Sequence, residues 1–456
     1  MTDTSGSLRI SHVGLRGVVG TALTAAHILD FASAFGTFLE PGGAVVIGRD
    51  PRASSLMLRE GVIAGLEACG HDVVDLGLVP TPVIQHAIRR MDAAGGVSIG
   101  ASHNSAEWNA LKFFGRQGTY LSTAEAGELL DIYHLKKFDF VEWTRLGKLR
   151  LEAGAIDSYL DELASVYDFA ALRSFRVVVD CCNGTSSVIL RRVNERFGTG
   201  FILINEKMEG VSFAHEPSTT RDTVALQLAP LMKPLHADAG FLFDVDSDRV
   251  ALADEDGKPI SEEIILPLLA DYLLPKCHGK LVITNLSSTA LLEDIAARHG
   301  GKVIRVPVGR QAAIDALSGY RPEQIALAGE GTGAVMMPQF RFVYDGIASM
   351  LAILSMMRER GQGLQAILSG YPRYHILKGQ VPLVTQRIPA LLMELRELYQ
   401  NGSANMVDGL RVDWPDRWFH VRVSQTEPVV RVICEQRGQA PRALFDTLME
   451  HVRSYA

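Results

Sequence analysis

The 456-residue sequence contains little cysteine and no long apolar segment. Its five cysteines are odd in number and form no C-x-x-C pair, so we expect reduced thiols and no disulfide framework. The longest helix-like apolar stretch, Ile347 to Met357, is far shorter than the roughly 20 residues that cross a bilayer. Residues 1–10 carry neither a basic nor an apolar signal region. We therefore expect a cytoplasmic protein with no membrane partner.

Positive charge is also scarce. Lysine and arginine together number 45 against 52 acidic residues, which gives a net charge of -7 at pH 7. A chain of this charge has no overall positive field to attract a phosphate backbone, so we expect no nucleic-acid partner. With 47% hydrophobic and 21% charged residues, the composition is typical of a globular protein with substantial cores. The length suggests roughly three or four domains.

Short β-rich runs alternate with helical stretches through most of the chain. The pattern appears in three blocks, with apolar runs that include residues 44–47, 72–76, 97–99, 176–180, 240–243, 281–285 and 325–327. Such alternation predicts mostly parallel sheets covered by helices on both faces. The remainder, from about Arg373, reads as short strands between two helices. The predicted class is α/β, with three similar mixed α/β domains and a smaller C-terminal α+β domain.

Each block ends with a strand that runs into a polar loop. In open α/β sheets, ligands bind beyond the carboxyl ends of the strands, so these loops are the candidate functional sites. The loops are Ala101-Ser102-His103-Asn104, Asp244-Val245-Asp246-Ser247-Asp248 and Gly329-Glu330-Gly331-Thr332-Gly333.

The serine loop predicts an anion site. Asn104, with Glu107 three residues later, resembles the start of a helix, and a helix start would place the Ser102 hydroxyl near backbone N–H groups that favour a phosphate. The alternative is that Ser102 and Asn104 only cap this helix. A hydrolase nucleophile elbow fits less well, because Asn104 stands where that motif requires glycine.

The acidic loop predicts a site for a divalent cation. Asp244, Asp246 and Asp248 alternate after an apolar strand, and oxygen ligands suit Mg²⁺ or Ca²⁺. An EF-hand is a poor alternative because Arg249 occupies the position that requires glycine. A solvated acidic turn is the other alternative.

A C-terminal strand carries a possible phosphate clamp. On extended backbone Arg422, Ser424 and Thr426 face the same side, and Arg431 can return after the Glu427-Pro428 turn. An edge strand with ordinary polar residues is the alternative.

The glycine-rich loop at 329–333 matches neither the dinucleotide nor the P-loop pattern. Glu330 and Thr332 could bond to sugar hydroxyls. A loop without a ligand is equally compatible with the pattern.

In this order the four motifs resemble the α-D-phosphohexomutase superfamily over nearly the whole chain. The resemblance implies four domains around a central cleft: a phosphoserine domain at 1–150, a metal-binding domain at 151–255, a sugar-recognition domain at 256–372 and a phosphate-binding domain at 373–456. It implies that Ser102 carries a phosphoryl group and, with Asp244, Asp246 and Asp248, contributes to an Mg²⁺ site. It further implies sugar contacts from Glu330 and Thr332 and phosphate contacts from Arg422, Ser424, Thr426 and Arg431.

Two N-terminal motifs extend the resemblance. Residues 14–17 (Gly-Leu-Arg-Gly) and 48–52 (Gly-Arg-Asp-Pro-Arg) match further family loops, which implies a substrate contact for Arg49. The catalytic candidates beside Ser102 are Arg16, His103 and Lys112, for proton handling or charge stabilisation. The sequence departs from the usual family residues at Ser105, Ala110, Val245, Ala334 and Gln425.

The resemblance implies an isomerase that interconverts hexose 6-phosphates and hexose 1-phosphates through a phosphoserine and a hexose 1,6-bisphosphate. Residues 108–112 and the G-E-G-x-G loop are most similar to phosphoglucosamine mutases, so glucosamine 6-phosphate is the expected substrate. The alternatives are a phosphomannomutase or phosphoglucomutase, a catalytically silent sugar-phosphate-binding homologue, and a metal-dependent phosphatase.

Overall fold

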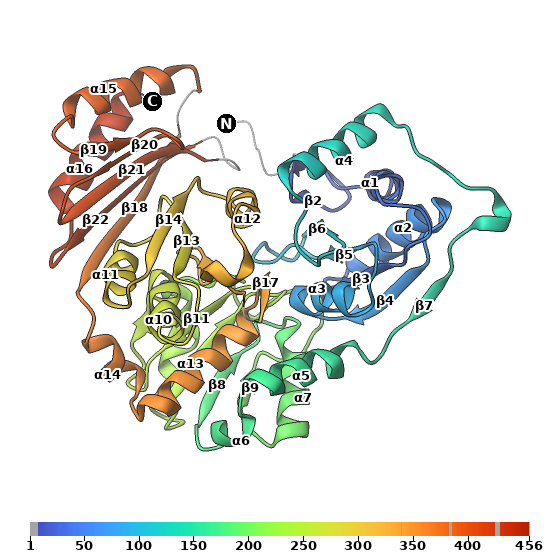
Figure 1. Cartoon of the computed structure of the whole chain (residues 1–456), viewed down its shortest axis with the longest axis horizontal. Helices are drawn as coiled ribbons and strands as arrows, with labels where there is room; N and C mark the ends of the chain where they lie inside the picture. Colours follow the sequence, from blue (N-terminus) through green and yellow to red (C-terminus); the bar gives the residue numbers. More distant parts are fainter. Residues whose placement is uncertain (1–7, 339, 383–384, 425–428, 456) are drawn as a thin grey trace. The chain divides into compact units, whose positions relative to one another are not determined.

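The computed structural model describes residues 8–338, 340–382, 385–424 and 429–455 (Figure 1). The chain forms two compact units. The first unit contains residues 1–265 and 332–365, and the second contains residues 266–331 and 366–456. Helices α10 (Ile265–Leu273) and α14 (Leu364–Ser369) lie where the chain passes from one unit to the other.

The first sheet belongs to the first unit and has the strand order β1-β2-β6-β5-β3-β4-β7. The strands on the β3 side are parallel, whereas β6 runs antiparallel to both β5 and β2. Phe31 and Phe35 of helix α1 pack on Phe113 of β6, which joins the helix layer to the sheet. The elements are β1 (Arg9–Ser11), β2 (Gly14–Val18), α1 (Ala25–Phe38), β3 (Val45–Arg49), α2 (Ser55–Ala68), β4 (Val73–Leu78), α3 (Thr81–Arg90), β5 (Gly95–Ile99), β6 (Trp108–Gly115), α4 (Thr123–Leu135) and β7 (Leu149–Leu151).

The second sheet, also in the first unit, has the order β12-β11-β10-β8-β9. Its central strands are entirely buried, as expected for strands covered by helices on both faces. The hairpin of β16 (Val335–Met337) and β17 (Arg341–Tyr344) and the buried helix α13 (Gly346–Arg360) complete this unit. The other elements are α5 (Ala155–Val166), α6 (Phe169–Leu172), β8 (Val177–Asp180), α7 (Ser186–Phe197), β9 (Ile202–Ile204), α8 (Arg221–Gln227), α9 (Ala229–Met232), β10 (Ala239–Phe243), β11 (Val250–Ala253) and β12 (Pro259–Ile260).

The second unit combines a parallel α/β layer with the C-terminal antiparallel sheet. Strand β13 pairs in parallel with both β14 and β15. The C-terminal sheet has the order β18-β22-β21-β20-β19 and is antiparallel throughout. The elements are β13 (Leu281–Asn285), α11 (Leu291–Arg298), β14 (Lys302–Val306), α12 (Arg310–Ser318), β15 (Ile325–Gly329), β18 (Tyr374–Pro382), α15 (Ile388–Leu398), β19 (Ser403–Asn405), β20 (Leu410–Asp413), β21 (Arg417–Val423), β22 (Val429–Arg437) and α16 (Arg442–Ser454).

The predicted fold class is confirmed: three α/β sheets precede an antiparallel C-terminal sheet domain. The five cysteines are free thiols. Of the helices in the described part of the chain, none has the length and apolar character needed to cross a membrane.

The expected helix after Asn104 is wrong. Residues 101–107 form turns, and strand β6 follows at Trp108, antiparallel to β5. The side chains of residues 108–114 are all buried, so this segment is stabilised as an interior strand and not as an amphipathic helix. Glu107 accepts a hydrogen bond from the Ser105 hydroxyl at 2.6 Å and caps no helix.

Candidate active site

Ser102 lies in the turn between β5 and β6. Its backbone adopts a left-handed conformation with φ of 49°, which is uncommon for a residue other than glycine. The side chain is nearly buried, and its hydroxyl donates a hydrogen bond of 2.5 Å to Asp244 Oδ2. His103 Nδ1 lies 3.4 Å from the same hydroxyl. The fold therefore brings the predicted serine loop and the acidic loop together.

The three aspartates of the acidic loop form one buried cluster. One oxygen of each carboxylate lies within 4.8 Å of an oxygen of the other two. Burial raises the pKa of Asp244 well above its ordinary value, and repulsion from Asp248 and Asp246 adds to the effect, while Arg249 and the Ser102 hydroxyl oppose it. The cluster thus concentrates negative charge where water cannot screen it.

This donor set fits a hard divalent cation. The cluster offers only oxygen ligands, which Mg²⁺ prefers. Asp246 Oδ2 accepts hydrogen bonds from Lys112 Nζ and, at 3.0 Å, from Thr81 Oγ1. Asp246 Oδ1, in contrast, is buried and accepts no hydrogen bond from any described residue. A bound cation would satisfy this oxygen and offset the repulsion within the cluster.

Lys112 and Arg16 lie on neighbouring strands of the first sheet. Lys112 is on β6 opposite Gly14 of β2, and Arg16 is two residues further along β2, opposite Ala110. The Lys112 ammonium pairs with Asp246 and lies 3.5 Å from Asp248 Oδ2. Strand pairing, which the expected helix would have prevented, therefore places Lys112 at the acidic cluster.

Arg49 ends strand β3 and is half-buried. Burial lowers the pKa of its guanidinium and the nearby Arg59 adds to this effect, while the carboxylates of Asp75 and Asp50 oppose it. Arg49 therefore carries a partly desolvated charge on the same sheet as Ser102.

Glu330 and Thr332 follow strand β15. Both have a buried side-chain oxygen, Glu330 Oε1 and Thr332 Oγ1, that makes no hydrogen bond within the described chain. Glu330 belongs to the second unit, where the adjacent Gly331 N–H donates to Ser288 Oγ at 3.2 Å. These oxygens are available to a polar ligand.

Two arginines of the predicted clamp are directly opposite each other. Arg422 on β21 pairs with Arg431 on β22, and Ser424 follows β21, its N–H bonded to Val429 O at 2.9 Å. Burial lowers the pKa of Arg422, and Arg431 adds to this effect, while Asp408 and Glu330 oppose it. Arg431 is half-buried, and two adjacent guanidinium groups of which one is buried favour an anion between them. Thr426 lies outside the described residues.

The sequence motifs missed some of the residues that support this site. Thr81 begins helix α3 and bonds to Asp246, and Arg249 donates its N–H to Asp244 Oδ1 at 3.2 Å. Arg52 was part of the motif at 48–52 but received no role of its own, although the structure places its guanidinium against the serine loop. The spacing of Asp50 and Arg52, two residues apart in the same motif, was the sequence signal that could have indicated their ion pair.

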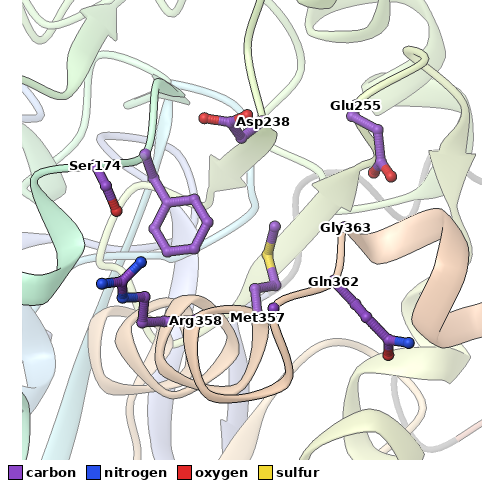
Figure 2. Close-up of a pocket in the computed structure, with 9 residues that line it drawn as sticks. Ser174, Asp238, Glu255, Met357, Arg358, Gln362 and Gly363 are labelled. Atoms are coloured by element: carbon purple, nitrogen blue, oxygen red, sulfur yellow. The ribbon is translucent and has the colours of Figure 1, made fainter.

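A separate hollow lies elsewhere in the first unit (Figure 2). Helix α13 supplies Met357 and Arg358 to its wall, and Asp238 and Glu255 add two carboxylates. None of the predicted site residues lines it. The candidate active site is therefore distinct from this hollow.

Family models match the chain in three consecutive segments. They describe α/β/α domains I, II and III of phosphoglucomutase/phosphomannomutase and match residues 10–139, 157–257 and 261–374 respectively.

Several whole proteins are also similar. A Pyrococcus abyssi protein named "Probable phosphoglucosamine mutase" is 34% identical over 426 residues, covering 92% of each chain. A Thermococcus kodakarensis phosphoglucomutase/phosphomannomutase is 31% identical over 434 residues, covering 93% of this chain and 94% of the relative. The crystal structure of a phosphoglucomutase/phosphomannomutase family protein from Burkholderia thailandensis has the same fold, with a TM-score of 0.83, 24% identity and coverage of 98% and 97%. The chain belongs to the α-D-phosphohexomutase superfamily and is a phosphohexomutase, an isomerase.

Proposed function

We propose that this phosphohexomutase interconverts glucosamine 6-phosphate and glucosamine 1-phosphate through a phosphorylated Ser102. The observation that carries the proposal is the 2.5 Å hydrogen bond from the Ser102 hydroxyl to Asp244, inside a buried cluster of three aspartates. Such a serine can hold a phosphoryl group beside a metal site and away from bulk water.

Two phosphoryl transfers account for the reaction. The first breaks the bond between phosphorus and Ser102 Oγ and forms a bond from phosphorus to a sugar hydroxyl, whose proton is lost. The bisphosphorylated sugar then turns, the bond between its other phosphorus and the sugar oxygen breaks, that oxygen takes up a proton, and the phosphorus bonds again to Ser102 Oγ. Arg16, His103 and Lys112 are the groups we assign to charge stabilisation and proton transfer. Burial of Ser102 limits hydrolysis of the phosphoserine by water.

Asp244, Asp246 and Asp248 would hold Mg²⁺ together with an oxygen of phosphorylated Ser102. When bound, Mg²⁺ supplies positive charge that stabilises the transferring phosphoryl group. Lys112 adds a further positive charge at Asp246 and Asp248.

We assign the non-reacting phosphate to Arg422, Ser424, Thr426 and Arg431, and further substrate contacts to Arg49, Glu330 and Thr332. The opposed arginines Arg422 and Arg431 support the first assignment, and the buried oxygens of Glu330 and Thr332 that bond to no described residue support the second. In domain terms, 1–150 supplies the phosphoserine, 151–255 the metal ligands, 256–372 the sugar contacts and 373–456 the phosphate contacts.

Glucosamine is proposed as the sugar on two grounds. A Glu330 carboxylate can pair with a 2-ammonium group, and the Sulfurisphaera tokodaii relative, 29% identical over 440 residues, is named phosphoglucosamine/phosphogalactosamine mutase. Phosphomannomutase or phosphoglucomutase activity is the second candidate, supported by the name of the Thermococcus kodakarensis relative.

Substitution of Ser102 tests the proposal. Ser102→Ala should abolish interconversion of all hexose phosphates and should remove the phosphoryl mass that intact-mass spectrometry finds on the wild-type chain after treatment with hexose 1,6-bisphosphate. Ser105→Ala is the control in the same loop, since this exposed hydroxyl bonds to exposed Glu107 and to no other residue that the structure describes. A wild-type chain that never acquires a phosphoryl group at Ser102 would refute the proposal. A panel of glucosamine, mannose and glucose phosphates then identifies the sugar.

A further inference from the structure

We propose that Arg52, covered by Phe213, is the positioning residue that holds the serine loop in its reactive conformation. The inference rests on the proposed role of Ser102 as phosphoryl carrier. It assigns a role to a buried arginine of the first unit that has no place among the metal or substrate contacts.

The Arg52 guanidinium donates to four backbone carbonyl oxygens between Ser102 and Trp108. Its Nη2 donates to the carbonyl oxygens of Ser102 at 2.9 Å and Asn104 at 2.7 Å. Its Nη1 donates to the carbonyl oxygens of Trp108, at 3.0 Å, and Ser105. One side chain thus fixes the loop from the reactive serine to the first residue of β6.

The fifth donor, Nε, pairs with Asp50 Oδ2 at 2.8 Å. Asp50 is itself fixed, because its Oδ1 accepts hydrogen bonds from Ser55 Oγ at 2.8 Å and from the Arg52 N–H at 3.1 Å. A guanidinium has five N–H donors, and all five are used within the protein. Arg52 is also only 1% exposed, so it has no donor left for a substrate phosphate.

The serine loop needs such a partner. Ser102 has a φ of 49°, a conformation that costs free energy and persists only where surrounding contacts enforce it. The carbonyl oxygens of buried Ser102 and half-buried Asn104 lie in turns and would lose these hydrogen bonds if Arg52 were absent. Lysine cannot replace arginine here, because an ammonium group lacks the planar fork that reaches four carbonyls.

The loop between β9 and α8 of the second sheet domain covers this arginine. The Phe213 ring lies over the guanidinium, with the Arg52 Cζ 4.9 Å from the ring centroid. Close approach of the two loops depends on Gly210, whose O accepts a 3.0 Å hydrogen bond from Ala53 N–H. A Cβ at Gly210 would lie 2.0 Å from Pro51 O.

Two contacts anchor the covering loop next to Phe213. The Ala214 N–H donates to Asn183 Oδ1 at 2.6 Å, and His215 Nε2 lies 3.1 Å from Asp180 Oδ2. Asp180 ends strand β8, so the cover is fixed to the sheet that also carries the acidic loop. Phe213 therefore shields Arg52 from water and aligns the serine loop with the aspartates.

Arg52→Lys tests the inference. We expect the rate at which hexose 1,6-bisphosphate phosphorylates Ser102, measured by quenched-flow and intact mass, to fall about 100-fold, the order of loss that a small misplacement of a reacting group causes. The KM for hexose phosphate should stay within about twofold, because no substrate contact is removed. Hydrogen exchange of the 102–108 amides should become faster. Arg59→Lys is the matched control: Arg59 pairs with buried Asp75 at 2.6 Å in the same sheet domain and should react at the wild-type rate.

Phe213→Leu provides a milder variant that keeps an apolar cover. Loss of the ring face should slow phosphorylation about threefold, and the change should have no further effect when added to Arg52→Lys. Wild-type phosphorylation rates in Arg52→Lys, or unchanged exchange at 102–108, would overturn the inference. If wild-type Ser102 itself is never phosphorylated, the proposed function fails, and the exchange measurement alone then decides whether Arg52 holds the loop.

Discussion

At the scale of single residues, the site depends on groups held in unfavourable states. Ser102 has a left-handed backbone, Asp244 has a raised pKa, and Asp246 has a buried oxygen that bonds to no described residue. Each of these features costs free energy in the free protein. A divalent cation would relieve the last two, because it offsets the repulsion at Asp244 and accepts Asp246 Oδ1 as a ligand, which is consistent with the proposed metal site.

Asp246→Asn should lower kcat by orders of magnitude. The change removes one negatively charged metal ligand, which lowers the affinity for Mg²⁺. It also removes an ion-pair partner of Lys112, which weakens the hold on the lysine ammonium group at the site. The measurement is kcat as a function of Mg²⁺ concentration after EDTA treatment. Asp254→Asn is a matched control, because Asp254 is equally buried but its carboxylate bonds to the backbone of a turn outside the cluster. Full activity of EDTA-treated wild-type protein would contradict the metal assignment.

At the scale of elements, the chemistry lies where strands end or pair. The turn between β5 and β6 presents Ser102, the loop between β10 and β11 presents the aspartates, and the β21–β22 pair presents the two arginines. The expectation that polar loops follow the ends of strands therefore located Ser102 and the aspartates correctly. The expectation of a helix after Asn104 failed because it considered only a local capping pattern, while burial on both faces made residues 108–115 a strand.

Replacing either clamp arginine should weaken all substrates alike. Arg422 and Arg431 are proposed to contact the phosphate that every candidate substrate shares, and loss of one charged contact costs about 1.5 to 3 kcal/mol. We expect Arg422→Ala and Arg431→Ala to raise KM to a similar degree for glucosamine, mannose and glucose phosphates. Exposed Arg417 at the start of β21 gives a control variant, Arg417→Ala. A loss confined to one sugar would argue against the phosphate role.

Buried His420, on the same strand as Arg422, predicts that the second unit loses folding stability at acidic pH. Burial lowers the pKa of His420 from 6.5 to about 4, with Arg422 and Arg411 contributing and Asp408 opposing. Its Nε2 lies 2.5 Å from Asp408 O and its Nδ1 lies 2.9 Å from Ser287 Oγ, and the neutral ring satisfies both contacts when its proton is on Nε2.

The unfolded chain binds a proton at His420 below about pH 6.5, whereas the folded chain does not until about pH 4. This contribution to stability is therefore complete above pH 6.5 and is lost as the pH falls, by at most about 1.4 kcal/mol per unit. Urea unfolding followed through tryptophan fluorescence at pH 7 and pH 5 measures the loss, and His420→Gln should reduce it. An equal loss in the variant would show that other groups are responsible.

At the scale of the whole molecule, the proposed roles divide between the two units. Ser102, Lys112 and the aspartates belong to the first unit, while Glu330 and the clamp arginines belong to the second. Substitutions of Ser102, Lys112 or the aspartates should therefore act mainly on kcat, and substitutions of Glu330 or the clamp arginines mainly on KM and sugar preference.

Glu330→Gln should change the choice of sugar. A carboxylate can pair with the 2-ammonium group of glucosamine, whereas an amide cannot, so kcat/KM should fall more for glucosamine phosphate than for glucose phosphate. Measuring kcat/KM for both sugar phosphates with one enzyme preparation in one coupled assay removes errors in enzyme concentration from the ratio of the two values. A uniform loss across sugars, with a sugar-dependent loss in Arg422→Ala, would reverse the roles assigned to the two residues.

The sequence by itself determined the α/β class, the C-terminal sheet domain and the residue types of the four motifs, because periodicity and composition are local properties. It also predicted which strand ends carry polar groups. Only the tertiary structure decided that β6 follows Ser102, that Lys112 pairs with Asp246, and that all five N–H donors of the Arg52 side chain form hydrogen bonds within the protein. These contacts join residues far apart in the chain, and their energies depend on burial and pairing that no local pattern contains.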